Sequence, residues 1–482
     1  MQSSRPPCAL PSEHSSDSFW HTEPSPLLTG HRSSRHLPLS TDVVVIGSGI
    51  TGASVAHHLL TSEPSAHNDE TKPMNVVMLE AREACWGATG RNGGHCQPLL
   101  SDQPDDPSIA AFELENFYAL EQLITACSID CEFVSQKGVR AIYSSSEVHQ
   151  MGIKLGILAI TAPDIRRRMT LVTDPAELKG LRVPSAKAAL ITDVAARMWP
   201  YKFVAYILEN LLTSQSLRGT FNLQTWTPAT AISVSQSNDN DTKWTVTTPR
   251  GTIKASRVVL ATNAYTSHLL PSYSDLIVPC RGQMSALRPV NSLKGSNRLP
   301  CSYGFLGEGL DDYLIQRLSS TGEQLMFGGG RQHDAKSMGT VDDSLVDSKI
   351  ASYLRSRLVE AFELPEAKGR YDGKLQLSAE SEWTGIMGFS RDDLPWVGPV
   401  PGQAGLFVSA GYTGHGMPNA WLCGRAVAEM VSGSDTAEKT TRDSSSLPHA
   451  YLITEERIER VRRQFEDVGV RDWAEMTRAA QH

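Results

Sequence analysis

The stretch Asp42-Val43-Val44-Val45-Ile46-Gly47-Ser48-Gly49-Ile50-Thr51-Gly52 decides the fold of this chain. Its first half is a run of β-branched residues, which is typical of a strand buried on both faces. Its second half fits G-x-G-x-x-G between that strand and a helix predicted from Ile50 to Leu60. Gly47 permits a tight turn, Gly49 lets the backbone approach a pyrophosphate, and Gly52 lets helix and strand pack closely. The free N–H groups at the helix start then favour an anion.

A second strand is predicted from Asn75 to Leu79, followed at once by Glu80, Ala81 and Arg82. Glu80 can accept hydrogen bonds from ribose hydroxyls, and it follows Gly52 by 28 residues, since a polar insertion occupies 62–74. These elements predict one dinucleotide-binding βαβ unit. The alternatives are a packing turn that binds no nucleotide and a solvated carboxylate at Glu80.

The composition of the chain narrows its function. At 482 residues it is long enough for two domains, and its net charge of −8 without a long basic run disfavours nucleic acid or anionic membranes as partners. The eight cysteines contain no C-x-x-C pair, so we expect no metal site, and no run of apolar residues is long enough to span a membrane. We expect a soluble, cytoplasmic protein.

Residues 1–40 differ from the rest of the chain. They contain ten serines, six prolines and four histidines with few apolar residues. Such a segment is too polar to bury a core, and its acidic residues disfavour a transit peptide. We predict a disordered, dispensable tail.

A glycine-rich stretch, 85–98, follows the second strand and cannot form a regular helix or strand. Arg91 and Asn92 within it can reach a pyrophosphate. Four later stretches add to this one: 199–201 (WPY), 258–265 (VVLATNAY), 382–388 (EWTGIMG) and 411–418 (GYTGHGMP). Together they span about residues 41–431, and with them the chain resembles the D-amino-acid-oxidase-like superfamily of FAD-dependent oxidoreductases. The similarity is greatest to its γ-glutamylputrescine oxidoreductase-like branch.

The resemblance implies an α/β fold in which a Rossmann-type FAD-binding domain is interleaved with a substrate domain built on an antiparallel sheet (α+β). The FAD domain would comprise 41–135, 190–275 and 375–435, and the substrate domain 136–189 and 276–374. Residues 436–482 would form a polar linker and a helix. FAD would be bound without a covalent bond.

The resemblance also implies cofactor contacts by position. The 411–417 stretch precedes a helix with Pro418 in its first turn, so the helix start can stabilise negative charge on the reduced flavin. A glycine-rich connection without a ligand is the alternative. The residues expected at FAD are Gly47, Ser48, Gly49, Ile50, Thr51, Gly52, Glu80, Ala81, Arg82, Gly87, Ala88, Thr89, Gly90, Arg91, Asn92, Gly93, Gly94, Ala229, Ala261, Thr262, Gly411, Tyr412, Thr413, Gly414, His415, Gly416 and Met417.

In this family a hydride leaves a carbon that bears an amine or hydroxyl and passes to flavin N5, so an amine must be neutral and no strong protein base is required. Each candidate for lining the pocket also has a purely structural explanation: His95 as a loop histidine, and Trp383 or Tyr313 as packed residues. The candidates are His95, Gln97, Tyr313, Trp383 and His415.

Two features leave the reaction open. Arg317 and Arg331 are possible clamps for a substrate carboxylate, but no motif selects either, and the stretch 325–331 lacks the lysine that sarcosine-oxidase-like relatives place over the flavin. We therefore expect oxidation of a C–N bond in a small amine or amino acid, with oxygen or another electron acceptor. The alternatives are a 2-hydroxyacid or alcohol oxidoreductase and a flavin-binding protein without turnover.

Overall fold

The computed structural model describes residues 5–61, 73–235, 243–433 (without 308, 335, 365, 368 and 372) and 447–464. Its first sheet has the order β18-β19-β10-β1-β2-β7, extended by β9 beside β10 and β8 beside β9. The central neighbours pair in parallel, while β18 and β9 are antiparallel to their neighbours. The strands are β1 (Ser40–Ile46), β2 (Met74–Leu79), β7 (Gly219–Gln224), β8 (Ala231–Val234), β9 (Trp244–Thr248), β10 (Gly251–Leu260), β18 (Trp396–Pro399) and β19 (Leu406–Ala410).

The central strand β1 is buried on both faces, as its β-branched run predicts. The side chains of Val43 and Val45 pack in the hydrophobic core between the sheet and the helices. Those of Val44 and Ile46 pack in the core on the opposite face of the sheet. The helices on the first side are α1 (Ile50–Thr61), α6 (Pro200–Thr213) and α9 (Ala420–Ser432). The Rossmann-type arrangement is confirmed, and it holds the start of α1 at the carboxyl end of β1.

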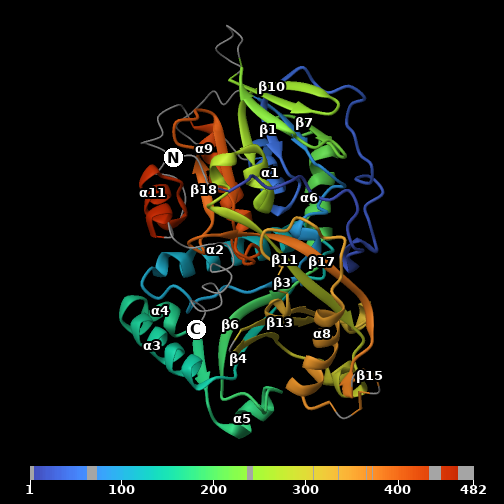
Figure 1. Ribbon diagram of the computed structural model, residues 1–482, viewed down its shortest axis with the longest axis vertical. Coiled ribbons are helices and arrows are strands. Elements are labelled where there is room, and N and C mark those ends of the chain that lie inside the picture. Colours follow the sequence, from blue (N-terminus) through green and yellow to red (C-terminus); the bar gives the residue numbers. More distant parts are fainter. Residues whose placement is uncertain are drawn as a thin grey trace.

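The second sheet has the order β17-β11-β14-β13-β12-β4-β6-β3, with β5 beside β6, and lies below the first in Figure 1. It is antiparallel except between β12 and β4. The strands are β3 (His95–Cys96), β4 (Val134–Ile142), β5 (Met169–Val172), β6 (Ala188–Arg197), β11 (Ile277–Leu287), β12 (Ser302–Gly307), β13 (Leu310–Gln316), β14 (Leu325–Gly329) and β17 (Ala379–Ser390). This confirms the predicted antiparallel sheet beside a dinucleotide fold.

Helices and one small hairpin surround the second sheet. Helix α8 packs against β11 and β14, and α3 and α4 lie at the lower left of Figure 1. Helix α2 contacts α9 and so connects this part of the molecule to the first sheet. The elements are α2 (Pro107–Ala126), α3 (Ser145–Thr161), α4 (Pro163–Arg166), α5 (Pro175–Gly180), α8 (Ser348–Ala361) and the hairpin β15 (Gly369–Tyr371) and β16 (Lys374–Gln376).

Three predicted boundaries are wrong. Residues 190–197 and 379–390, assigned to the FAD domain, lie in strands β6 and β17 of the second sheet, and β3 lies there as well. The sequence over Asp193–Leu212 also predicts a helix, but the helix begins only at Pro200, because Ala188–Arg197 pairs with β4. The apolar periods of a buried strand and a buried helix are similar over such short runs, so the pattern alone did not separate them. The predicted insertion 62–74 falls almost wholly outside the described residues.

The prediction of a disordered tail is wrong for residues 5–40. Trp20 is fully buried against Trp199, and its indole Nε1 donates to Asn92 O at 2.5 Å. Nearer the start, Cys8 N donates to Ser267 Oγ at 3.0 Å. A few aromatic anchors therefore fix a segment whose mean composition is that of a linker. We call residues 5–20 the N-terminal strap.

The C-terminal residues that the structure describes return to the first sheet. Helix α11 (Glu455–Gln464) is held by Arg457, whose Nη2 donates to Asp392 Oδ1 at 2.9 Å and whose Nη1 donates to Pro395 O at 2.9 Å. Among the described helices, none combines the length and the apolar character needed to cross a bilayer.

Candidate functional site

A cavity of about 590 Å³ extends from the glycine turn at the start of α1 to the second sheet. Most residues predicted at the cofactor line it: Gly47 to Thr51, Glu80 to Arg82, Gly87 to Thr89, Arg91 to Gly93, Ala229, Ala261, Thr262 and Tyr412 to Met417. It therefore joins segments from all three predicted parts of the FAD domain. Gly52, Gly90, Gly94 and Gly411 do not line it.

The glycine turn is built as its sequence predicts. Gly47 has a φ of +106°, and a Cβ there would lie 2.6 Å from Ala261 O. A Cβ on Gly52 would lie 1.9 Å from Gly47 O, so only glycine lets α1 pack this closely on β1. Glu80 holds the turn from the side, because its Oε2 accepts from Ser48 N at 3.0 Å. The turn thus presents bare main chain to the cavity.

The 87–94 stretch divides into two roles. A Cβ on Gly49 would lie 3.1 Å from Thr89 Oγ1, which also accepts from Ile50 N at 3.1 Å, so this stretch adjoins the turn of α1. A Cβ on Gly94, in contrast, would lie 2.4 Å from Met198 O and 2.9 Å from the Trp20 ring. Gly90 and Gly94 therefore make room for protein rather than for a ligand.

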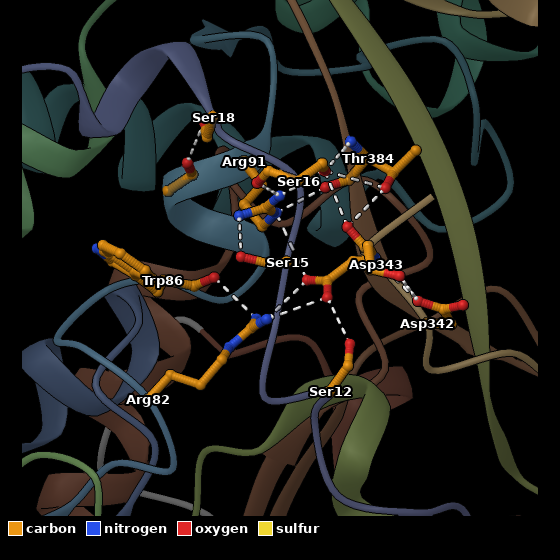
Figure 2. Close-up of polar contacts among 12 residues, drawn as sticks. Ser12, Ser15, Ser16, Ser18, Arg82, Trp86, Arg91, Asp342, Asp343 and Thr384 are labelled. Atoms are coloured by element: carbon orange, nitrogen blue, oxygen red, sulfur yellow. Dashed lines mark hydrogen bonds and ion pairs between the residues drawn. The ribbon is translucent and has the colours of Figure 1, made fainter. Parts of the chain in front are cut away.

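The guanidinium of Arg91 does not point at the turn, contrary to the predicted pyrophosphate contact. It donates from Nε to Thr384 O at 2.6 Å and from Nη2 to Ser16 Oγ at 2.8 Å (Figure 2). Burial, partly offset by Asp343, lowers the pKa of Arg91 to about 10. Arg91 is thus a structural link between the strap and β17.

Arg82 and Asp343 complete this cluster (Figure 2). Arg82 Nη1 lies 2.9 Å from Asp343 Oδ2, and both side chains are buried. Ser12 of the strap donates to Asp343 Oδ1 at 2.9 Å. The strap therefore joins residues beside the first sheet to residues beside the second.

Four of the five predicted pocket residues meet at the other end of the cavity, namely His95, Gln97, Tyr313 and His415. His95 and Tyr313 stack with ring centroids 6.1 Å apart. His95 Nε2 is buried without a hydrogen-bond partner among the described residues, and burial lowers the pKa of His95 to about 4. This histidine is neutral near neutral pH, and its Nε2 is free to form a hydrogen bond with a ligand.

His415 has the opposite electrostatic setting. Burial disfavours its charged form, but the carboxylate of Glu113, 2.9 Å from Nε2, together with that of Asp102 outweighs burial and raises the pKa of His415. The cavity thus holds two histidines whose environments separate their protonation states, which is typical of sites that divide acid and base roles.

Trp383 does not reach the cavity. It is fully buried, and its Nε1 donates to Arg91 O at 2.7 Å. The two possible carboxylate clamps are also engaged: Arg317 pairs with Glu132 at 2.6 Å, and Arg331 pairs with Asp311. Trp383 therefore fixes the 87–94 stretch on β17 instead of receiving a substrate.

Sequence reasoning missed several residues that line the cavity. Leu10 and Pro11 come from the strap, and Met284 from β11. Glu113 is the one with a readable signal, because a carboxylate in the apolar run Ile109–Leu114 is either paired or functional when buried. Asp102, Gln103, Arg140, Glu147 and Lys154 also line this end. Within the described residues, no group of three His, Cys, Asp or Glu is placed to hold a metal ion.

The model of the FAD dependent oxidoreductase family matches residues 42–430, which is most of the chain. The chain belongs to this family. Among relatives of this FAD-dependent oxidoreductase, γ-glutamylputrescine oxidoreductase of Escherichia coli (strain K12) is 23% identical over 441 residues, covering 85% of this chain and 87% of that protein. The predicted family is confirmed, and the predicted similarity to γ-glutamylputrescine oxidoreductase is found.

Solved structures share the fold. Glycine oxidase from Geobacillus kaustophilus superposes with a TM-score of 0.62 at 20% identity, over 83% of this chain and 96% of that one. L-proline dehydrogenase from P. horikoshii gives 0.61 at 21% identity, with the same coverage.

FAD is the cofactor of this oxidoreductase, as predicted. The cavity fits it on three observations: bare glycine main chain at one end, continuity to the second sheet, and a buried histidine nitrogen without a partner at the far end. An elongated dinucleotide needs such an uninterrupted path, with its anionic centre at a helix start.

Proposed function

We propose that the protein oxidises a small amine or amino acid at a C–N bond. The observation that carries this proposal is the single cavity that joins the glycine turn of α1 to His95, Gln97, Tyr313 and His415. The names of the similar proteins support an amine substrate, since γ-glutamylputrescine, glycine and L-proline each contain an amino group.

In this proposal the main chain from Gly47 to Thr51 holds the pyrophosphate, and Glu80 lies where the adenosine ribose would bind. Ala229 would meet the adenine, and Tyr412 to Met417 would face the flavin ring. None of the eight cysteines, all of them described, lines the cavity, which supports non-covalent binding. Their free thiols also support a reducing, cytoplasmic location.

When bound, FAD supplies a two-electron acceptor next to the substrate. The chain's own residues prepare the substrate for it. The amine must be neutral at the site, and His95 Nε2, itself neutral and without a partner among the described residues, can accept a hydrogen bond from its N–H and orient it. Tyr313 covers the site with an aromatic face, and its hydroxyl donates to Met284 Sδ at 3.1 Å. A neutral amine is the form from which a hydride can leave.

The test is an anaerobic panel of amines, amino acids and 2-hydroxyacids, followed at the flavin absorption band. We expect amines to bleach the flavin and hydroxyacids to leave it oxidised. In His95→Gln, which displaces the hydrogen-bond acceptor that orients the amine, bleaching by the same amine should slow at every pH. His149→Gln, an exposed histidine of α3, is the matched control.

Two outcomes would overturn the proposal. Bleaching by hydroxyacids alone would replace the substrate class, and a purified protein that is colourless and binds no added FAD would remove the activity.

A further inference from the structure

Helix α2 carries a carboxylate into the core behind the 411–417 stretch. Glu113 is 3% exposed, in a run of apolar residues, yet both of its oxygens are engaged. Oε2 accepts from Leu99 N at 2.7 Å, and Oε1 accepts from Asn419 Nδ2 at 3.1 Å. Oε1 also lies 2.9 Å from His415 Nε2. One side chain thus holds three segments: the loop after β3, the 411–417 stretch and the start of α9.

The two partners of this pair are not equally exposed to the cavity. The side chain of His415 is 28% exposed, whereas that of Glu113 is only 4% exposed. Both residues line the cavity, and His415, the positive end of the pair, is the more open of the two. In a site from which water is excluded, such a fixed orientation acts strongly on any charge that develops nearby.

The charges around His415 do not cancel this arrangement. From the loop after β3, Asp102 favours its charged form, and from β4, Arg140 disfavours it. These two neutralise each other, since Arg140 Nη1 lies 2.5 Å from Asp102 Oδ1. His95 of β3 is neutral near neutral pH. Behind the pair, the Tyr451 hydroxyl donates to Asn419 Oδ1 at 2.9 Å and is uncharged. Glu113 is left as the group that sets the charge of His415.

We propose that Glu113 is a positioning residue that keeps His415 as an imidazolium at the cavity wall, where it stabilises the anionic reduced state of bound FAD. In this role Glu113 acts through His415, because its two oxygens are taken up by Leu99 N, Asn419 Nδ2 and His415 Nε2. The proposal rests on the assignment of this cavity to FAD under the proposed function, and it predicts a pH-dependent flavin potential that one internal carboxylate controls.

The experiment compares the midpoint potential of bound FAD with pH in the holoenzyme, in Glu113→Gln and in Glu115→Gln. Glu115 is the matched control, because it lies on the same helix but pairs with Arg425 at the surface. Near neutral and mildly alkaline pH we expect Glu113→Gln to disfavour reduction about tenfold, which is about 30 mV for a two-electron couple. At acidic pH, where His415 protonates without help, its potential should return to that of the holoenzyme. The control should follow the holoenzyme throughout.

Two further measurements keep the test decisive if Glu113→Gln folds poorly. His415→Gln should show the lower potential at every pH, with no recovery in acid. The imidazole NMR signal that is present in the holoenzyme and missing in His415→Gln belongs to His415. In Glu113→Gln this signal should titrate at lower pH than in the holoenzyme. Potentials equal to the holoenzyme's in His415→Gln would overturn the inference. Retention of FAD with unchanged potentials defeats this inference alone, whereas failure to bind FAD defeats the proposed function.

Discussion

Arg82 and Asp343 form a buried ion pair, 2.9 Å from Nη1 to Oδ2, that joins the end of β2 to the segment before α8. Arg91 Nε lies 3.5 Å from the same Oδ2, so one carboxylate neutralises two buried arginines. Ser12 adds a third donor from the strap. One buried acid therefore links the end of β2, the 87–94 stretch and the strap.

Asp343→Asn should destabilise the fold by about 3–5 kcal/mol, because it leaves buried guanidinium groups without a counter-charge. Chemical denaturation would measure this as a lower midpoint. Asp342→Asn is the control, because Asp342 is more exposed than Asp343 and its carboxylate accepts a hydrogen bond from Ser344 N. Equal midpoints for the two variants would contradict the importance of the pair.

Deleting residues 1–16 should lower FAD content after dialysis and reduce the melting temperature. The deletion removes Leu10 and Pro11 from the cavity wall and Ser12 and Ser16 from the arginine cluster. It keeps Trp20, the main anchor of the strap. Glu13→Gln, at an exposed position of the strap, should behave as the unchanged protein. Full FAD retention by the truncated chain would show that the strap is dispensable.

Gly49→Leu should abolish FAD retention while the protein stays folded. A Cβ at Gly49 meets only Thr89 at 3.1 Å, so the chain tolerates it, but a longer side chain would occupy the place of the pyrophosphate. Flavin absorbance after gel filtration measures retention, and circular dichroism measures folding. Gly152→Ala on α3, where a Cβ meets nothing within 4 Å, should keep its flavin. A yellow, folded Gly49→Leu protein would refute the assignment of the turn.

Stability should fall as the pH is lowered below 6.5. Burial lowers the pKa of His95 and His57 to about 4 and that of His21 and His58 to about 3. Between these pKa values and pH 6.5, the unfolded chain therefore binds protons that the folded chain does not. Each unit of pKa difference lowers the free energy of unfolding by roughly 1.4 kcal/mol. Denaturation midpoints against pH would show the decline, and His95→Gln should reduce its slope.

His415 should show the reverse dependence. Its folded-state pKa is raised, so its pairing with Glu113 contributes fully below 6.5 and is lost as the pH rises through the folded-state pKa. Denaturation at mildly alkaline pH would measure this, and in Glu113→Gln the alkaline loss should disappear. A loss of the same size in that variant would assign the effect to another group.

The local parts of the fold could be predicted because their signals are local. The β-branched run before Gly47, the glycine spacing and the strand predicted over Asn75–Leu79 all follow from backbone and packing preferences within a few residues. The family resemblance added the second sheet. Within the site, the resemblance predicts one pocket lined by His95, Gln97, Tyr313 and His415, and these four residues line one cavity of the structure.

The errors concern contacts between residues far apart in the sequence. Arg91 was expected at a phosphate because it follows glycines, but its partners, Thr384 and Ser16, lie 293 and 75 residues away. The strap has the composition of a linker. It is ordered because the ring of Trp20 packs against Trp199, and because Gly94 has no side chain that would clash with this ring. Contacts between residues so far apart in the sequence produce no periodic pattern and no motif from which they could be predicted.

The strap is synthesised before its partners, which include Ser267, Asp343 and Thr384. Its docking is complete only after residue 384 has left the ribosome, so this segment is made early and fixed late. Until then the wall formed by Leu10 and Pro11 is missing. The glycine turn of α1 is thus made long before the strap covers the cavity, so the order of synthesis leaves this turn uncovered for most of the time that the chain is being made.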